Sequence, residues 1–234
     1  MNIFLDTDFR DYYDHRFCGS WQKPDIVFSR KTTDGPDRVG IFNELKKAGL
    51  QVPEHGMASD LISRWKSKWK KAGIDNYMGE VQALVVYDDL HAHQGKGKRR
   101  LTVDEVEKFG LGNLFAAEFI PTTPGSGSWS LRWLRAGLRR FWLRYTSFDD
   151  WRSNYGDVSI ELLFEEKRSD SLPKEKSLVW ETPLVAVDFI NAGPMGLIAV
   201  DLNIAPGIQG SGVEKLMLAR EVYDEIENFF TSSK

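Results

Sequence analysis

The feature that most constrains this chain is a pair of apolar segments near its C-terminus, separated by a turn that glycines bound on both sides. Leu184–Ile190 and Leu197–Leu202 flank the turn Gly193-Pro194-Met195-Gly196, and each apolar segment carries one aspartate. Short apolar segments joined by such a turn predict an antiparallel β-hairpin. The second half of the chain is therefore predicted to contain a largely antiparallel sheet.

The two aspartates of this hairpin are predicted to face each other. Asp188 and Asp201 are equally far from the centre of the turn, and side chains of directly opposed residues lie about 4.5–5.5 Å apart at Cβ. Asn203, two residues beyond Asp201, shares their face. Facing carboxylates repel each other unless a cation lies between them or one is protonated. Oxygen ligands of this kind suit magnesium, so a metal site is one interpretation; two solvated aspartates on an edge hairpin are the other.

The remaining sequence predicts an α+β protein. Apolar neighbours of the two aspartates are expected to face the core: Val187, Phe189, Val200 and Leu202. Helical periodicity is found at 38–48, 61–72 and 214–230, with a further helix beginning at Thr102. Strands are expected at 25–29, 50–53, 80–87, 114–120, 129–136, 140–145 and 158–165, with a hairpin turn at Gly137.

Composition excludes several classes of protein. The formal net charge is −3, which gives no overall basic field for nucleic acid or membrane. The single cysteine, Cys18, cannot form an internal disulfide. No apolar segment approaches the roughly 20 residues of a membrane span, and the N-terminus does not have the pattern of a signal peptide. We therefore expect a soluble cytoplasmic protein with no membrane partner.

Two sequence blocks carry a resemblance to a known family. Val187-Asp188-Phe189-Ile190 followed by Val200-Asp201-Leu202-Asn203-Ile204-Ala205-Pro206-Gly207 resembles the end of the ATP-grasp fold, and most of all the RimK-like carboxylate–amine ligases. Leu131-Arg132, followed by Asp149-Asp150-Trp151-Arg152-Ser153-Asn154, resembles the phosphate-contacting segment of the same family. The resemblance implies two α+β lobes that hold Mg-ATP between them, with Asp188, Asp201 and Asn203 as magnesium ligands.

The same resemblance assigns further residues. Arg132, Arg152 and Asn154 become contacts to phosphate and to the acyl-phosphate intermediate, which fits the geometry of arginine. Ala117-Glu118-Phe119-Ile120 resembles the hinge strand, so Glu118, Phe119 and Ile120 are expected to meet adenine. Ser29–Pro53 resembles the entry helix and the turn after it.

The chain also departs from the family pattern. Arg38 and Tyr87 stand where the family usually places two lysines. Lys96 or Lys98, in the glycine loop with Gly95, is expected to reach the phosphates instead. The segment before residue 29 is shorter than the usual extra N-terminal domain. The implied division is a short N-terminal segment and entry helix at 1–55, an N-lobe at 56–120 and a C-lobe with the metal hairpin at 121–234.

The resemblance implies an ATP-dependent ligase. A carboxylate attacks the γ-phosphate of ATP, and an amine then displaces phosphate from the acyl phosphate; the substrates are expected to be an amino acid or a peptide. One alternative is a catalytically degenerate relative that binds nucleotide or serves as an interaction module. The other is single-stranded nucleic-acid binding, because aromatic residues alternate with arginines over 129–152. Alternation that buries the aromatics and exposes an arginine face explains the same pattern. The sequence does not predict the oligomeric state.

Overall fold

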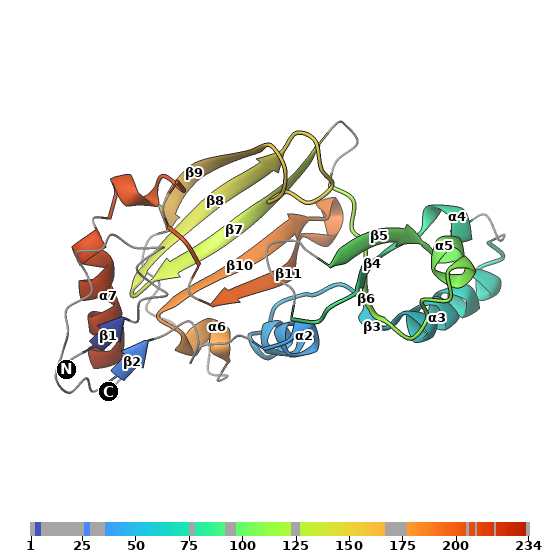
Figure 1. The fold of residues 1–234 in the computed structure, drawn as a ribbon, viewed down its shortest axis with the longest axis horizontal. Helices are drawn as coiled ribbons and strands as arrows, with labels where there is room; N and C mark the ends of the chain where they lie inside the picture. Colours follow the sequence, from blue (N-terminus) through green and yellow to red (C-terminus); the bar gives the residue numbers. More distant parts are fainter. Residues whose placement is uncertain are drawn as a thin grey trace.

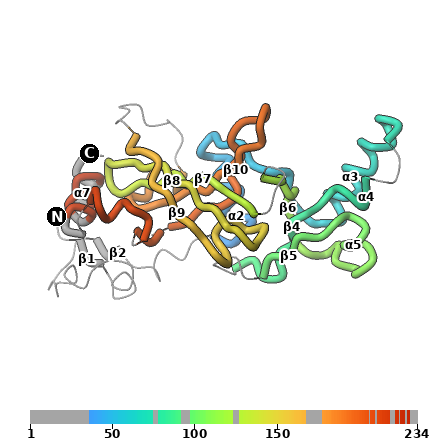
Figure 2. Tube along the Cα trace, turned by 90° about the horizontal axis from the view of Figure 1, so that it is seen from above, coloured from blue at the N-terminus to red at the C-terminus, as the bar shows by residue number. Residues whose placement is uncertain are grey.

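The structure is a computed structural model that describes residues 3–5, 26–28, 36–74, 78–91, 97–122, 127–166, 177–204, 206–208, 210–217 and 219–232. It is elongated, with a large antiparallel sheet in one half and a smaller sheet with helices in the other (Figures 1 and 2). The expected α+β architecture of two lobes is confirmed.

The large sheet has the strand order β11-β10-β7-β8-β9. Its strands are β7 (Ser128–Ala136), β8 (Arg139–Ser147), β9 (Val158–Glu166), β10 (Leu184–Asn191) and β11 (Leu197–Ile204). One face packs against the segment 206–217, with its short helix η3 (Val213–Lys215), and against α7 (Ala219–Ser232). The other face packs against α2 (Arg38–Lys47) and α6 (Leu178–Glu181). Helices on both faces bury the middle of the sheet.

The smaller sheet has the order β3-β6-β4-β5. It consists of β3 (His55–Met57), β4 (Ala83–Tyr87), β5 (Lys98–Thr102) and β6 (Phe115–Glu118). A core of its own joins it to α3 (Ala58–Lys71) and α5 (Val103–Lys108), while α4 (Met78–Val81) precedes β4. Thr102 and Glu105 form a complete capping box at the start of α5, as expected of that spacing. A separate two-stranded parallel pair is formed by β1 (Ile3–Leu5) and β2 (Ile26–Phe28).

Several predicted element boundaries are wrong. The strand expected at 80–87 begins only at Ala83, because Met78–Val81 forms the short helix α4. No strand forms at 50–53; the chain pairs later, at β3. The helix expected at 214–230 is replaced by η3 and then α7. Lys98, placed in a loop by its sequence context, is the first residue of β5. That strand was missed because four of its five residues are polar and show no apolar alternation.

Gly137 turns the chain between β7 and β8 in a place that only glycine can occupy. Its φ is +61°, and a Cβ atom added there would lie 2.1 Å from the carbonyl oxygen of Glu225 on α7. We expect Gly137→Ala to lower the free energy of unfolding by about 2–5 kcal/mol, from left-handed strain of about 1–2 kcal/mol and overpacking of about 1–3 kcal/mol. Urea denaturation measures the change.

Gly49→Ala is the matched control for this variant. Gly49 also has a positive φ, +78°, but an added Cβ would meet no atom within 4 Å. Its free energy of unfolding is expected to fall by only about 1–2 kcal/mol, from the left-handed strain alone. Equal losses of unfolding free energy in the two variants would show that the close approach of Gly137 to α7 does not affect stability.

Candidate active site

The hairpin β10–β11 pairs Asp188 directly with Asp201, as predicted. The route to this register differs from the symmetric turn that the sequence implies. Next to the turn, Asn191 pairs with Leu197 and Phe189 with Ala199, one residue out of symmetry. A β-bulge at Val200 then restores the register at Asp201. Val200 was predicted to face the core, which is wrong, because the bulge turns it into the cleft between the lobes.

The two aspartates are not solvated, although Asp201 lies on the outermost strand β11. Asp188 is 6% exposed and Asp201 is 9% exposed, and β10 lies inside the sheet between β7 and β11. The alternative of an outward-facing, solvated pair is therefore wrong. Buried carboxylates have to be compensated by nearby positive charge.

Asp188 is compensated by an arginine on the neighbouring strand. Arg132 lies opposite Asp188 in the β7–β10 register. Its Nε donates to Oδ1 at 2.6 Å and its Nη2 donates to Oδ2 at 2.8 Å. The amide of Asn203 also donates to Asp188 Oδ2, at 3.3 Å. Burial by itself would lower the pKa of Arg132, but Asp188 reverses that effect and raises it. The guanidinium is therefore a permanent cation beneath the hairpin.

Asp201 is compensated by two cations from other elements. Arg38 Nη1, at the start of α2, donates to Asp201 Oδ1 at 2.5 Å, and Lys98 Nζ, on β5, donates to Oδ2 at 3.4 Å. Burial would raise the pKa of the Asp201 carboxyl, but these two cations hold it well below its ordinary value. Three cations thus surround two carboxylates, and the cluster keeps one excess positive charge.

Lys98 occupies a position that the sequence did not reveal. It pairs directly with Tyr87 across the β4–β5 ladder, and its Nζ lies 5.8 Å from the centre of the Tyr87 ring. Burial lowers the pKa of the Lys98 ammonium, and the neighbouring Asp201 offsets part of that effect. The amine thus lies beside the residue at which the family pattern expects a lysine, but it is supplied by the adjacent strand.

A cleft between the two sheets joins this charged cluster to an aromatic end. It holds about 750 Å³, including its open mouth. Among the predicted site residues, these line it: Tyr87, Lys98, Glu118, Phe119, Ile120, Arg152, Asn154, Asp188 and Asp201. Arg38, Arg132 and Asn203 do not line the cleft but contact the aspartates that do. Trp129 and Trp151, which sequence reasoning gave no role in the cleft, line it as well.

The hinge residues differ in what their backbone N–H groups can do. The N–H of Glu118 donates to Glu54 O at 2.7 Å, and that of Phe119 donates to Ala83 O at 3.0 Å. Within the described residues the N–H of Ile120 has no acceptor. At the same end of the cleft, the rings of Phe119 and Trp151 meet edge to face at 5.8 Å between centroids. A planar ligand group can pack here and receive one backbone hydrogen bond.

Arg152 reaches the cleft with its charge already balanced. Its Nε and Nη2 donate to the two carboxylate oxygens of Asp150 at 2.8 and 2.7 Å. Its guanidinium carbon lies 3.7 Å from the centre of the Tyr155 ring. The hydrogen bonds that Arg152 donates to Asp150 raise the pKa of Arg152. Asp150, which sequence reasoning did not assign, therefore fixes the orientation of this arginine.

Comparison with known proteins yields matches only among solved structures. No family model and no curated protein matches the chain. An ATP-grasp ligase, PsnB, complexed with a phosphomimetic variant of a minimal precursor, Mg and ADP, matches at a TM-score of 0.51 with 15% identity. The match covers 88% of this chain and 63% of that one. PsnB complexed with the minimal precursor matches at 0.50 with 13% identity, covering 88% and 64%.

The chain has an ATP-grasp fold. It spans slightly less than two thirds of the length of the PsnB chains that it matches. The ATP-grasp cleft of this chain combines the predicted hairpin, the predicted hinge and the Arg152–Asn154 segment in one cavity. Gly95 and Lys96, predicted to cover phosphates, lie outside the described residues.

The donor set of the ATP-grasp hairpin fits magnesium. Asp188, Asp201 and Asn203 supply hard oxygen atoms on one face of the sheet, and magnesium takes a few such ligands together with phosphate oxygens and water. No group of three or more His, Cys, Asp and Glu side chains gathers as a metal site in the described part of the chain. A metal here would therefore rely on the amide of Asn203 and on ligand oxygens.

The arginine-rich strands of this ATP-grasp fold do not form a free basic face. Among their arginines, Arg135 is buried, and Arg132 is partly buried and paired with Asp188. Arg139 pairs with Glu165 at 2.7 Å, and Arg144 pairs with Glu161 at 2.5 Å. The prediction that alternation exposes an arginine face is wrong, and single-stranded nucleic-acid binding is not favoured. No described helix has the length and apolarity needed to cross a membrane.

Proposed function

We propose that this protein is an ATP-dependent ligase that joins a carboxylate to an amine through an acyl phosphate. The observation that carries the proposal is the cluster in which Arg38, Lys98 and Arg132 surround the paired carboxylates Asp188 and Asp201 beside the cleft. Such a cluster offers cations to phosphate oxygens and, once they move, oxygen ligands to a metal. The ATP-grasp fold and the family pattern in the sequence support the same reaction.

The position of each residue in the cleft determines the role that we propose for it. Lys98 and Arg38 would turn from Asp201 to the phosphates of ATP, and the N–H of Ile120 would meet the adenine ring. Asp188, Asp201 and Asn203 would hold magnesium, which when bound neutralises charge on the β- and γ-phosphates. Glu118 and Phe119 would line the base site rather than donate from their backbone. Tyr87, buried behind Lys98, would support the lysine instead of contacting phosphate.

The reaction has two balanced steps. An oxygen of the substrate carboxylate attacks the γ-phosphorus, the bond to the β–γ bridging oxygen breaks, and ADP leaves with that electron pair. The amine nitrogen then attacks the acyl carbon, phosphate leaves, and the nitrogen loses a proton to solvent. Arg132 would offset charge from beneath the hairpin. Arg152, held by Asp150, would orient the acyl group together with Asn154.

The finer assignment is to the RimK-like ligases, on the two sequence blocks that carry that resemblance. The substrate acid is proposed to be an amino acid or a peptide, on the resemblance in the sequence; the matched PsnB structures contain a minimal precursor. The division into segments 1–55, 56–120 and 121–234 is proposed on the same basis. The cytoplasmic location remains a prediction from the sequence.

A nucleotide-binding protein without catalysis is the second candidate. It is favoured by one observation: Asp201, a proposed metal ligand, is engaged by two cations at once. If Arg38 and Lys98 stay paired with Asp201, this carboxylate cannot bind magnesium, and nucleotide would bind without the metal that catalysis needs.

The two candidates are separated by one pair of measurements. Mg-ATP is expected to raise the melting temperature of the protein, and a mixture of carboxylic acids with free amines is expected to release ADP. A melting shift with Mg-ATP, but no ADP release with any of the carboxylic acids, would identify a nucleotide-binding protein without catalysis. No melting shift at millimolar Mg-ATP would overturn both candidates.

A further inference from the structure

The face of the large sheet that carries α6 contains a second unusual group of residues, away from the cleft. The strand registers place two transverse rows side by side on this face. One row runs Trp133, Trp142 and Phe164 across β7, β8 and β9. The other runs Arg135, Arg140 and Glu166 across the same strands, and each of its members is two residues away from the member of the first row on that strand. Residues two apart on a strand share a face, so the rows are in contact.

The charged row contains one carboxylate, Glu166, which forms no ion pair with the arginines of the row. Arg135 is 1% exposed and lies directly opposite Arg140. Its Nη2 donates to the carbonyl oxygens of Val179 and Thr182, but Nε and Nη1 are buried without a hydrogen-bond partner, as is Nε of Arg140. Glu166, the carboxylate of the row, accepts from the indole of Trp133 at 3.0 Å instead. Among the described residues, neither arginine of this row has an ion pair.

The aromatic row becomes progressively exposed towards the edge of the sheet. Trp133 is buried, Trp142 is half-buried, and Phe164 is 54% exposed. Phe164 packs on Trp142 at 6.4 Å between ring centroids. Leu163, beside it on the bulged part of β9, is 38% exposed. β9 is an outermost strand of this sheet, and large exposed apolar side chains on such a strand are typical of interaction sites.

Structural packing alone does not account for the two arginines. Like charges that are directly opposed on a sheet destabilise it, and a buried cation without an anion is costly. Arg135 lies over the ring of Phe229, at 4.9 Å, but a ring face does not neutralise a second guanidinium. A carboxylate placed at Arg140 would remove the repulsion. Arg140 is partly exposed, so that carboxylate can come from another molecule.

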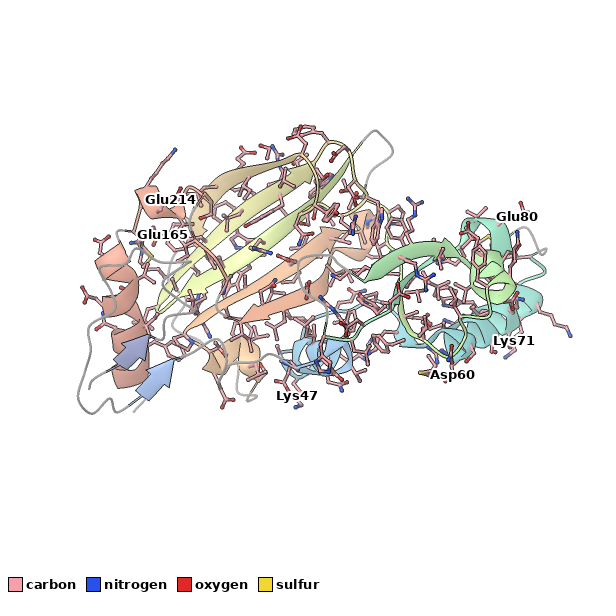
Figure 3. All side chains as sticks on the ribbon, viewed as in Figure 1. Lys47, Asp60, Lys71, Glu80, Glu165 and Glu214 are labelled. Carbon is pink, nitrogen blue, oxygen red and sulfur yellow. The ribbon has the colours of Figure 1, made fainter. Side chains whose placement is uncertain are left out.

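We infer that these two rows form a docking surface for a peptide that carries a carboxylate side chain next to an apolar one. The carboxylate would pair with Arg140 and Arg135, and the apolar side chain would pack on Phe164 and Trp142. The outer edge of β9 offers backbone groups to an extended segment. Glu165, between Phe164 and Glu166, lies towards the end of the large sheet that points away from the smaller lobe (Figure 3). The surface is therefore separate from the cleft and does not depend on the proposed reaction.

The test is a binding titration followed by fluorescence polarisation. The probe is a short fluorescein-labelled peptide in which glutamate alternates with leucine, and the matched probe replaces glutamate by glutamine. The glutamate peptide is expected to bind at least tenfold more tightly than the glutamine peptide. Arg140→Gln and Phe164→Ser are each expected to weaken its binding at least tenfold, while the melting shift with Mg-ADP stays unchanged.

Phe148→Ser is the matched control, since Phe148 is also highly exposed, at 57%, and lies outside both rows. It is expected to bind the glutamate peptide as the parent does. Equal affinity for the two peptides, or equal binding by parent and Arg140→Gln, would overturn the inference. Dimerisation that is lost in Phe164→Ser, measured by light scattering, would also overturn it, because a second copy would then occupy the surface.

Discussion

Replacing Asp201 with asparagine is expected to leave nucleotide binding in place but to abolish its dependence on magnesium. Asparagine removes one negative charge, so Arg38 and Lys98 gain freedom to pair with phosphates, and ADP without metal should bind as tightly as before or more tightly. The magnesium-dependent increase in affinity, which we expect to be at least tenfold in the parent, should disappear because a carboxylate ligand is lost.

Isothermal titration with ADP, in EDTA and in magnesium, measures both quantities for the parent and for Asp201→Asn. Asp188→Asn is the companion variant, because Asp188 is paired with a different cation, Arg132. It should lose the magnesium effect to a similar degree. A magnesium effect of parental size in both variants would show that the paired carboxylates serve only as salt-bridge partners. Circular dichroism establishes that the variants are folded.

Replacing Lys98 with methionine is expected to weaken ADP binding at least tenfold. Hydrogen bonds to charged groups contribute about 1.5–3 kcal/mol, and a change of about 1.4 kcal/mol is tenfold in affinity. Methionine keeps the apolar length of the side chain beside Tyr87. Lys70→Met, which removes an exposed lysine of α3 far from the cleft, is the control and should bind as the parent does.

A double variant tests the location of this amine more sharply. Because residues 87 and 98 are direct partners across the ladder, exchanging them as Tyr87→Lys with Lys98→Tyr moves the amine one strand across. The exchange is expected to recover affinity relative to Lys98→Met. Affinity for ADP that stays at parental level in Lys98→Met would remove this lysine from the phosphate site.

The parts of this fold that the sequence predicts are those with regular periodicity. The register of Asp188 with Asp201 follows from two apolar segments and a turn, and it is correct. The bulge at Val200 is not predictable in the same way, because a bulge depends on packing between strands that are distant in sequence. Lys98 was predicted near the phosphates but in the wrong element, since Lys98–Thr102 lacks an apolar alternation.

The sequence did not predict which charged residues pair with one another. Arg38 and Asp201 are 163 positions apart and Lys98 and Asp201 are 103 apart, so only the tertiary fold brings them together. The same holds for Arg135. The alternation of aromatic residues and arginines around it predicted that Arg135 would be exposed. Its burial follows from the position of β7 in the middle of the sheet, with α6 packed on that face.

The bond between Lys98 and Asp201 also connects the smaller sheet to the larger one. This contact joins β5 to β11 across the cleft. A phosphate that paired with Lys98 would break this ion pair between the lobes. The phosphate would then bridge the two lobes in its place. If Lys98 binds phosphate as proposed, ligand exchange would be coupled to the separation of the two lobes, and nucleotide should enter no faster than that ion pair opens.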